Sequence, residues 1–243
     1  MSPATRRLPD LSPLPGHVVL ILSGGLDSSV LAWWLHRQGC RVTAVSVDYG
    51  QRHRVEVEYA RGVAARLGVA HEVVDLCGVG RLLGGSALTD IAVPVPAGHY
   101  TDVSMRATVV PHRNALMLDV AVALAVSAKA DAVAFAAHAG DHPIYPDCRP
   151  AFRDTYQRMV LVANDGFLVD GFRVLAPFLG LSKADIVALG AELDVLFTST
   201  WSCYEGGDRH CGVCGTCVER REAFALAGVP DPTSYRSGGG EVG

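Results

Sequence analysis

The sequence predicts an α/β fold, an open and mainly parallel sheet with helices on both faces. Two observations predict this class. Short apolar runs rich in β-branched residues alternate with stretches of helical periodicity along most of the 243 residues. Strands that are separated by crossover helices pair in parallel. One main domain is expected, because the chain is long enough for one sizeable core.

The first half of the chain alternates regularly. The predicted elements are a strand over 17–22, a helix over 27–38, a strand over 42–47, a helix over 56–67 and a strand over 72–76. From residue 78 to residue 110 the periodicity is poor, because Gly and Pro break any long element. Long irregular excursions of this kind are often functional.

The alternation resumes after this excursion. The predicted elements are an apolar helix over 114–130, a buried strand over 131–137, a helix over 151–162, a short strand and helix within 172–193, and a last helix near 218–227. Ser182 is the expected N-cap of the helix within 172–193, and Asp185 stands in the position of a capping box.

Composition and charge narrow the classes of function. The formal net charge is −4 and the chain has no long basic run, so a broad electrostatic contact with nucleic acid is not expected. No apolar run reaches the roughly 20 residues of a membrane helix. The first 16 residues resemble a frayed tail more than a signal peptide. We therefore expect a soluble, cytoplasmic protein without a membrane or nucleic-acid partner.

The turn after the first strand has the composition of an anion site. Its residues are, in order, Leu22, Ser23, Gly24, Gly25, Leu26, Asp27, Ser28 and Ser29. Glycines let backbone N–H groups converge, serines add hydroxyl donors, and the next helix begins there with its positive end. A loop at the carboxyl end of a parallel strand also lies where such sheets bind ligands. Phosphate is favoured, although Gly and Ser are common in ordinary turns.

Asp27 is the unexpected residue of this turn, because a carboxylate repels phosphate. A Mg²⁺ ion between the two groups would remove the repulsion. We interpret Asp27 as a ligand on the metal side or as a residue that orients the loop. Capping of the helix is the alternative.

Four of the seven cysteines, Cys203, Cys211, Cys214 and Cys217, lie within 15 residues. Thiolates at this spacing can converge on one ion, and tetrahedral Zn²⁺ is its natural identity. Four protein ligands leave no open position, so the expected role of one zinc per chain is structural. An iron–sulfur cluster is the main rival, and His210 is interpreted as a neighbour of the site.

Several motifs carry a resemblance to known enzymes. SGGLDS (23–28) resembles the signature of the PP-loop ATP pyrophosphatases, which share the fold of adenine nucleotide alpha hydrolases and hold the β,γ-pyrophosphate of ATP. The likeness becomes specific with DYGQRHRVE (48–56), VPHRN (110–114), YPDCR (145–149) and the cysteine spacing. Together, and in this order, they resemble the 7-cyano-7-deazaguanine synthase family of the queuosine pathway.

The resemblance implies an ATP-dependent carbon–nitrogen ligase. ATP with Mg²⁺ adenylates the carboxylate of 7-carboxy-7-deazaguanine, ammonia displaces AMP to give the amide, and a second ATP activates the amide so that dehydration yields the nitrile. A homodimer is also implied. The expected regions are a flexible tail over 1–16, a PP-loop nucleotide-binding domain over 17–199, a zinc-binding loop with the C-terminal helix over 200–235, and a disordered tail over 236–243.

Roles for single residues follow from these motifs. Lys183 is expected to face charge that develops on the α-phosphate, and Arg113 to contact substrate or phosphate; a surface ion pair is the alternative for each. With Asp27 they form the expected catalytic set. Asp48 joins the turn residues 22–29 as an ATP contact. The expected substrate contacts are Gln51, Arg52, His53, Arg113, His138, Asp141, Tyr145, Asp147 and Arg149.

One segment departs from the family. AAHAGDHPI (136–144) stands before YPDCR where many members have Gly-Val-Asn and an acidic and aromatic run. The departure does not affect the expected adenylation, but it leaves open which amine accepts the activated acid. Transfer of the same acid to a different amine is therefore one alternative. A PP-loop enzyme that modifies tRNA is another, although it usually needs a basic RNA-binding extension. A non-enzymatic zinc module ranks last.

Overall fold

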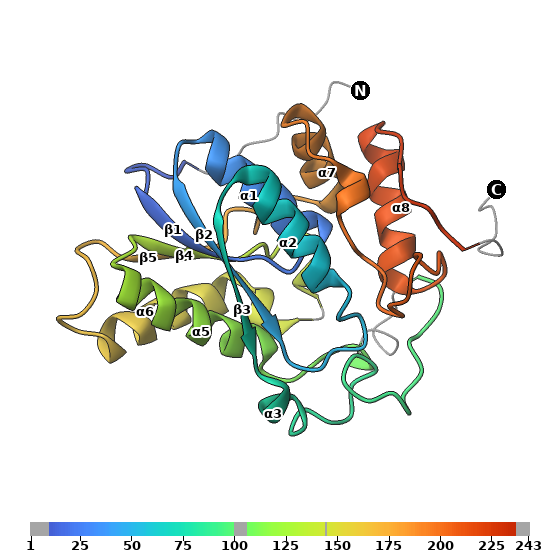
Figure 1. Cartoon of the computed structure of the whole chain (residues 1–243), viewed down its shortest axis with the longest axis horizontal. Helices are drawn as coiled ribbons and strands as arrows, with labels where there is room; N and C mark the ends of the chain where they lie inside the picture. Colours follow the sequence, from blue (N-terminus) through green and yellow to red (C-terminus); the bar gives the residue numbers. More distant parts are fainter. Residues whose placement is uncertain (1–9, 100–105, 144, 237–243) are drawn as a thin grey trace.

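The computed structural model describes residues 10–99, 106–143 and 145–236. These residues form a five-stranded sheet with the order β3-β2-β1-β4-β5 (Figure 1), in which neighbouring strands pair in parallel. The strands are β1 (His17–Ile21), β2 (Arg41–Asp48), β3 (Ala70–Asp75), β4 (Ala132–Ala134) and β5 (Arg173–Leu175). The predicted parallel α/β class is confirmed.

Helices cover both faces of the sheet, as predicted (Figure 1). One face carries α1 (Leu26–Arg37), α2 (Glu56–Leu67), α7 (Lys183–Glu192) and α8 (Gly215–Ala227); the other carries α5 (Arg113–Ala128) and α6 (Pro150–Ala163); the short α3 (Cys77–Gly80) follows β3. Side chains of β1 alternate between two cores, with Val18 and Leu20 on the α1 side and Val19 and Ile21 on the α5 side. The whole strand is buried because both of its faces are covered.

The order of the strands creates a crevice at one edge of the sheet. From β1 the chain continues to β2 and β3 on one side, and it then crosses to β4 and β5 on the other side. At such a switch point the connections that leave the two central strands diverge, and ligands bind between them. The turn after β1 and the segment after β4 both open at this edge.

The element boundaries lie close to the predicted ones. The helix α2 spans the predicted residues, and the predicted capping box is present, since Asp185 N donates to Ser182 Oγ at 3.2 Å and Ser182 N donates to Asp185 Oδ2 at 2.9 Å. The strand β4 is shorter than predicted, because its partner β5 ends at Leu175. The helix α8 begins earlier than predicted, because Cys214 takes its N-cap position.

The two ends of the chain differ in how much of them is described. Leu11 is buried in the core and accepts a hydrogen bond from Arg173 NH1 at 3.1 Å, so part of the predicted N-terminal tail packs on the domain. Residues 1–9 and 237–243 of the two predicted tails lie outside the described residues.

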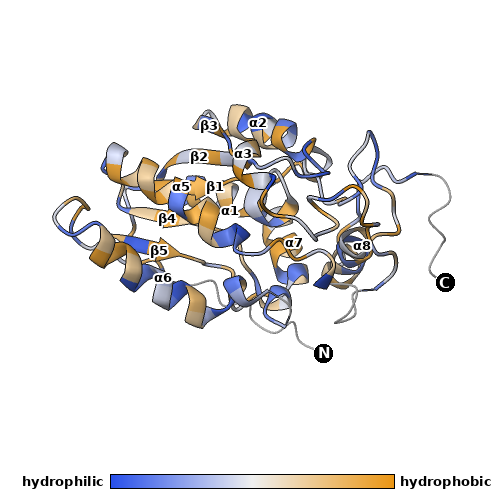
Figure 2. Cartoon of the chain, turned by 90° about the horizontal axis from the view of Figure 1, so that it is seen from below, coloured by the Kyte–Doolittle hydropathy of each residue, from blue (hydrophilic) through white to orange (hydrophobic). Residues whose placement is uncertain are grey.

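Hydropathy follows this layering. Figure 2 shows hydrophobic colours along β4 and a mixture of hydrophobic and hydrophilic residues along α6, which has an exposed face. Among the described residues, none of the helices combines the length and the apolar character needed to cross a membrane.

Candidate active site

A pocket opens at the carboxyl ends of the central strands. Its walls come from the turn after β1, the β2–α2 connection, the segment after β4 and the first residues of α5, α7 and α8. Eleven residues predicted for the site line it: Leu22, Ser23, Gly25, Leu26, Asp27, Ser28, His53, Arg113, Asp141, Tyr145 and Lys183. Motifs that are far apart in the sequence therefore meet in one cavity.

The turn after β1 has the geometry of an anion cradle. Gly24 has a φ of +80°, and a Cβ there would lie 2.1 Å from the carbonyl oxygen of Glu56, so a side chain at this position would collide with α2. Ser28 Oγ accepts from Ser23 N at 3.2 Å. Gly25 takes the N-cap position of α1 and has no side-chain cap within the described residues. The first N–H groups of α1 are therefore open to an anion.

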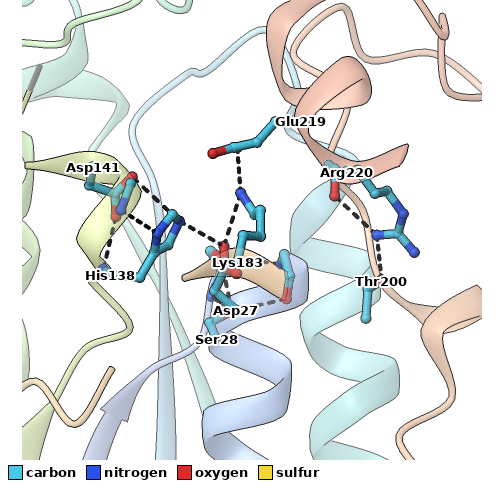
Figure 3. Close-up of polar contacts among 12 residues, drawn as sticks. Asp27, Ser28, His138, Asp141, Lys183, Thr200, Glu219 and Arg220 are labelled. Carbon is cyan, nitrogen blue, oxygen red and sulfur yellow. Dashed lines mark hydrogen bonds and ion pairs between the residues drawn. The ribbon is translucent and has the colours of Figure 1, made fainter. Parts of the chain in front are cut away.

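Three charged side chains form a cluster beside this turn, which we call the ion cluster: Asp27, Lys183 and Glu219 (Figure 3). Lys183 Nζ donates to Glu219 Oε2 at 2.6 Å and lies 3.4 Å from Asp27 Oδ2. Only 15% of the Lys183 side chain is exposed. Burial alone would lower the pKa of Lys183, but Asp27 and Glu219 outweigh it and raise the pKa, so the ammonium stays charged.

Asp27 has one oxygen that the protein leaves open. Its Oδ2 faces Lys183, whereas its Oδ1 is buried and has no hydrogen-bond partner in the described part of the chain. The side chain does not cap α1, whose N-cap is Gly25. A buried carboxylate oxygen without a donor is costly unless a cation or a ligand donor completes it. This oxygen therefore fits a ligand or metal contact better than the capping alternative.

The segment that departs from the family forms a wall next to the ion cluster. His138 caps a short 3₁₀ turn (Ala139–Asp141), since its Nδ1 accepts from Gly140 N at 3.0 Å. Its Nε2 lies 3.6 Å from Asp141 Oδ1 and 3.9 Å from Asp27 Oδ2 (Figure 3). Burial raises the pKa of Asp141, although His138 and Lys183 partly offset it. This segment thus contacts the carboxylate of the turn through His138.

A second polar group lies in the β2–α2 connection. Glu56, the first residue of α2, accepts from Gln51 Nε2 at 3.1 Å through Oε1, and the same oxygen lies 3.5 Å from His53 Nε2. Burial raises the pKa of Glu56 to about 7, although Gln51 and Arg113 partly oppose the shift. Burial, with the charges of Arg113 and Arg52, lowers the pKa of His53 to about 3. His53 is therefore neutral near pH 7, and Glu56 is the member of this pair that gains and loses a proton in that range.

Arg113 supplies a buried positive charge to the pocket wall. Burial by itself disfavours the charge, but the hydroxyls of Tyr49, Tyr204 and Tyr145 raise the pKa of Arg113, and Tyr49 accepts a hydrogen bond from it. Tyr145 is itself held by Thr108, with 3.0 Å between Tyr145 Oη and Thr108 Oγ1. Aromatic rings around a guanidinium suit a flat, anionic ligand.

Cys148 also lies in the pocket wall. Its Sγ accepts from Asn114 Nδ2 at 3.1 Å, and burial, with Asp141 and Asp147 nearby, raises the pKa of the thiol. The thiol is thus protonated near neutral pH, when a nucleophile would need to be a thiolate. Packing is the better interpretation of Cys148.

Eight other predicted residues lie outside the pocket wall: Gly24, Ser29, Asp48, Gln51, Arg52, His138, Asp147 and Arg149. Several of them hold the protein itself. Arg52 NH2 donates to the carbonyls of Ile91 at 2.9 Å and Val93 at 3.0 Å, and Asp147 Oδ2 accepts from Asn114 N at 3.1 Å. Their contacts position the walls of the pocket.

Sequence reasoning missed some lining residues, among them Tyr49, Glu56, Tyr204 and Glu219. Glu56 had a signal, because it stands in the first turn of a helix that follows the second strand at the ligand-binding edge. No pattern in the sequence pointed to Glu219, since only the fold of the cysteine segment brings α8 to Lys183.

The four cysteine thiols converge as predicted. The Sγ atoms of Cys203, Cys211, Cys214 and Cys217 lie within 4.8 Å of one another, and all four residues are buried. Cys211 Sγ accepts from the backbone N–H of Cys214 at 3.2 Å, a contact that stabilises a thiolate. All four are free cysteines. The set can hold one metal ion, and its chemistry fits zinc.

The cysteine segment is joined to the pocket by its neighbours. Trp201 N donates to the carbonyl of Gly24 at 2.9 Å, and α8 carries Glu219 two residues after Cys217. His210 Nε2 accepts from Ser202 N at 3.0 Å, which agrees with its interpretation as a neighbour of the site. A metal bound here would therefore fix one wall of the pocket.

Comparisons with known proteins agree with this geometry. A family described as Queuosine biosynthesis protein QueC matches residues 17–228. A 7-cyano-7-deazaguanine synthase of Rhizobium meliloti is 57% identical over 89% of this chain and 91% of its own length. One of Paracoccus denitrificans is 56% identical over 89% of this chain and 92% of its own.

Solved structures share the fold at low identity. A crystal structure of a 4-thiouridine synthetase with RNA and bound ATP superposes with a TM-score of 0.51 at 17% identity, over 88% of this chain and 50% of that chain. This likeness concerns the fold alone, whereas the family match spans most of the chain and includes both the turn after β1 and the four cysteines. The chain therefore belongs to the QueC family of queuosine biosynthesis proteins.

Proposed function

We propose that this chain is an ATP-dependent ligase that converts 7-carboxy-7-deazaguanine, through the amide, to 7-cyano-7-deazaguanine. The relatives that are 54–57% identical bear the name 7-cyano-7-deazaguanine synthase. The observation that carries the proposal is that the anion cradle of the turn after β1 and the cationic, aromatic wall around Arg113 face one pocket. A triphosphate and a flat acid can thus meet there.

The nucleotide occupies the side of the turn. Ser23, Gly25 and Ser28 hold the β- and γ-phosphates at the N-terminus of α1, as helix starts commonly do. Lys183 then faces the α-phosphate, where negative charge grows as the substrate oxygen attacks. Asp27 Oδ1, which lacks a donor among the described residues, suits a Mg²⁺ ion that travels with ATP. Asp48, at the end of β2, remains the proposed contact for adenosine.

The acid occupies the side of Arg113. Its carboxylate pairs with the guanidinium, and its ring lies against Tyr145 and His53. The carboxylate oxygen bonds to the α-phosphorus and pyrophosphate leaves, which gives an acyl-adenylate. Ammonia then bonds to the acyl carbon and AMP leaves with the electron pair of the broken C–O bond. In a second cycle the amide oxygen bonds to the α-phosphorus, pyrophosphate leaves and one proton leaves nitrogen. The C–O bond then breaks, and loss of AMP and of the last N–H proton leaves the nitrile.

The other predicted substrate contacts are proposed to act by shaping the walls of the pocket. His138 and Asp141 lie beside Asp27, so they are proposed to shape the site of the acceptor. Gln51 holds Glu56, Asp147 holds the start of α5, and Arg149 Nε donates to the carbonyl of His142 at 2.8 Å. These three residues would position substrate contacts made by their neighbours.

Zinc is proposed as the metal of the cysteine set, one ion per chain. Bound there, it supplies a structural cross-link and no reactive position. Its removal with a chelator is expected to loosen residues 203–217 and to detach Glu219 from Lys183. Metal analysis distinguishes this from the iron–sulfur alternative, which would give visible absorption and iron.

The reaction itself can be tested in one experiment. Purified protein is incubated with Mg-ATP, 7-carboxy-7-deazaguanine and ammonium, and the products are identified by mass spectrometry. AMP, pyrophosphate, amide and nitrile are expected. AMP and pyrophosphate without amide or nitrile would indicate transfer to a different amine, the alternative that the His138 segment raised. Absence of AMP with the acid would contradict the substrate assignment.

The expected setting of the enzyme is a homodimer in the cytoplasm that uses free ammonia. Light scattering of the purified chain tests the dimer, and ammonium dependence of amide formation tests the nitrogen source.

A further inference from the structure

Glu56 is a carboxyl group inside the reaction pocket for which the proposed mechanism has no role so far. It lines the same cavity as Ser23, Asp27 and Arg113, and its main-chain oxygen packs on Gly24 of the anion cradle. Only 14% of its side chain is exposed. The group is therefore enclosed, but its open side faces the pocket.

The neighbours of Glu56 hold its side chain in place by hydrogen bonds without pairing it with a positive charge. Gln51 Nε2 donates to Glu56 Oε1 at 3.1 Å, and Gln51 is itself fixed, since its Oε1 accepts from Tyr49 N at 2.9 Å. Among the described residues, the charged and titratable groups that face Glu56 are His53, at 3.5 Å between His53 Nε2 and Glu56 Oε1, and Arg113 and Tyr49 at longer range. All three line the pocket.

His53 adds an independent sign of a ligand. It is 3% exposed and lines the pocket, and its Nδ1 is buried without a hydrogen-bond partner in residues 10–99, 106–143 and 145–236. A buried ring nitrogen of this kind is costly unless a bound molecule completes it. The Glu56–His53 pair thus borders a place where a polar ligand group belongs.

We propose that Glu56 is a catalytic base, which takes the proton that nitrogen must lose when ammonia attacks the acyl-adenylate and again when the activated amide becomes the nitrile. This role rests on the function proposed above. In the first step the N–C bond forms, the C–O bond to AMP breaks, and one proton passes from nitrogen to the Glu56 carboxylate. Adenylation of the amide oxygen releases one N–H proton to solvent. In the second step the C–O bond to AMP breaks and the last N–H proton passes to the same group. Solvent removes the proton between the steps.

The protonation of Glu56 suits this task. Its pKa of about 7, raised by burial, lets the carboxylate accept a proton and release it again near neutral pH. Lys183 cannot exchange protons in this range, because the ion cluster keeps it charged. Adenylation of the acid needs no base, since the substrate carboxylate already carries the attacking lone pair. Glu56 is therefore required for the nitrogen steps and dispensable for the first adenylation.

Two half-reactions of the same enzyme separate these roles. Exchange of labelled pyrophosphate into ATP, dependent on 7-carboxy-7-deazaguanine, measures adenylation, and amide formation at constant free ammonia measures the nitrogen step between pH 6 and pH 8.5. For Glu56→Gln we expect exchange within about threefold of wild type and amide formation reduced about 10²–10³-fold. The rise of wild-type amide formation through pH 7 should be absent from the variant.

Two further variants serve as controls. Glu58→Gln changes an exposed carboxylate on the same helix, paired with Arg61, and should leave both half-reactions unchanged. Glu56→Asp keeps a carboxylate and should recover part of the amide formation together with its pH dependence. Amide formation by Glu56→Gln equal to wild type, or by Glu56→Asp no faster than by Glu56→Gln, would overturn the role. Absence of exchange in wild type would instead contradict the proposed function.

Discussion

The two sides of the pocket hold charge in different ways. On one side, Lys183 lies between Asp27 and Glu219, and these carboxylates raise its pKa so that it stays charged. On the other side, Glu56 is buried beside a neutral His53, and burial raises its pKa to about 7. The first arrangement, which we call the fixed side, is suited to a constant electric field on phosphate. The second, which we call the labile side, is suited to proton exchange.

The largest effect is expected at the fixed side. Lys183→Met removes the charge that faces the α-phosphate, and acid-dependent pyrophosphate exchange should fall about 10²–10³-fold. Lys129→Met is a matched control, because Lys129 is exposed at the end of α5 and its side chain donates to the carbonyl of Phe167, far from the pocket lining. Exchange that survives in Lys183→Met would break the distinction between the two sides.

The labile side predicts a change of stability with pH. Because the pKa of Glu56 is raised in the folded state, the native protein binds this proton more tightly than the unfolded chain, and the contribution of Glu56 to the free energy of unfolding falls as the pH rises through 4.5 to 7. Glu56→Gln removes that penalty, so the variant should be about 2–3 kcal/mol more stable than wild type at pH 8.

Urea denaturation measures this difference. The gain should shrink towards zero below about pH 4, where the carboxyl group is neutral in both states because the pH lies below its unfolded-state pKa of 4.5. The shift of His53 has the opposite sign, but it is present in both proteins and largely cancels. Equal stability of the two proteins at pH 8 would show that burial of Glu56 does not hold its proton.

A smaller effect is expected at Glu219, which supports the fixed side from α8. Glu219→Gln keeps an acceptor for Lys183 Nζ but removes a negative charge, so exchange should fall about tenfold while the rise of amide formation near pH 7 stays. Metal content is the control. Loss of metal from this variant would mean that Glu219 acts through the cysteine segment rather than through Lys183.

The smallest effect on catalysis is expected at Arg52, which lies outside both sides. Its guanidinium holds carbonyls of residues 90–93, so Arg52→Ala should lower the free energy of unfolding by about 1–2 kcal/mol. The KM for the acid should change less than about threefold. A large rise of KM without loss of stability would restore the direct substrate contact that the sequence predicted.

The comparison also explains what the sequence could predict. The turn after β1 could be predicted from the sequence because its residues are consecutive in the chain. A turn at the carboxyl end of a central parallel strand lies at the ligand-binding edge of the sheet. The cysteine set was readable from spacing for the same reason. Arg113 and Lys183 could be singled out as cations at helix starts, where the helix dipole does not favour them.

Contacts between segments that are distant in the chain could not be predicted from the sequence. Glu219 meets Lys183 only because α8 packs beside α7, and no pattern within either helix reports this. Arg52 looked like a substrate contact in its motif, yet it holds the backbone of a loop about 40 residues later. Motifs identify which segments form the site, whereas tertiary packing decides which side chain of each segment faces the ligand.

The central claim is that the pocket joins the oxygen of the acid to the α-phosphorus of ATP. The most direct test uses 7-carboxy-7-deazaguanine labelled with ¹⁸O in its carboxylate, turned over with ATP and ammonia. The account predicts that the AMP released in amide formation carries one ¹⁸O atom on its phosphate, with unlabelled pyrophosphate as the other product. Unlabelled AMP, or the label in inorganic phosphate with ADP as the other product, would contradict it.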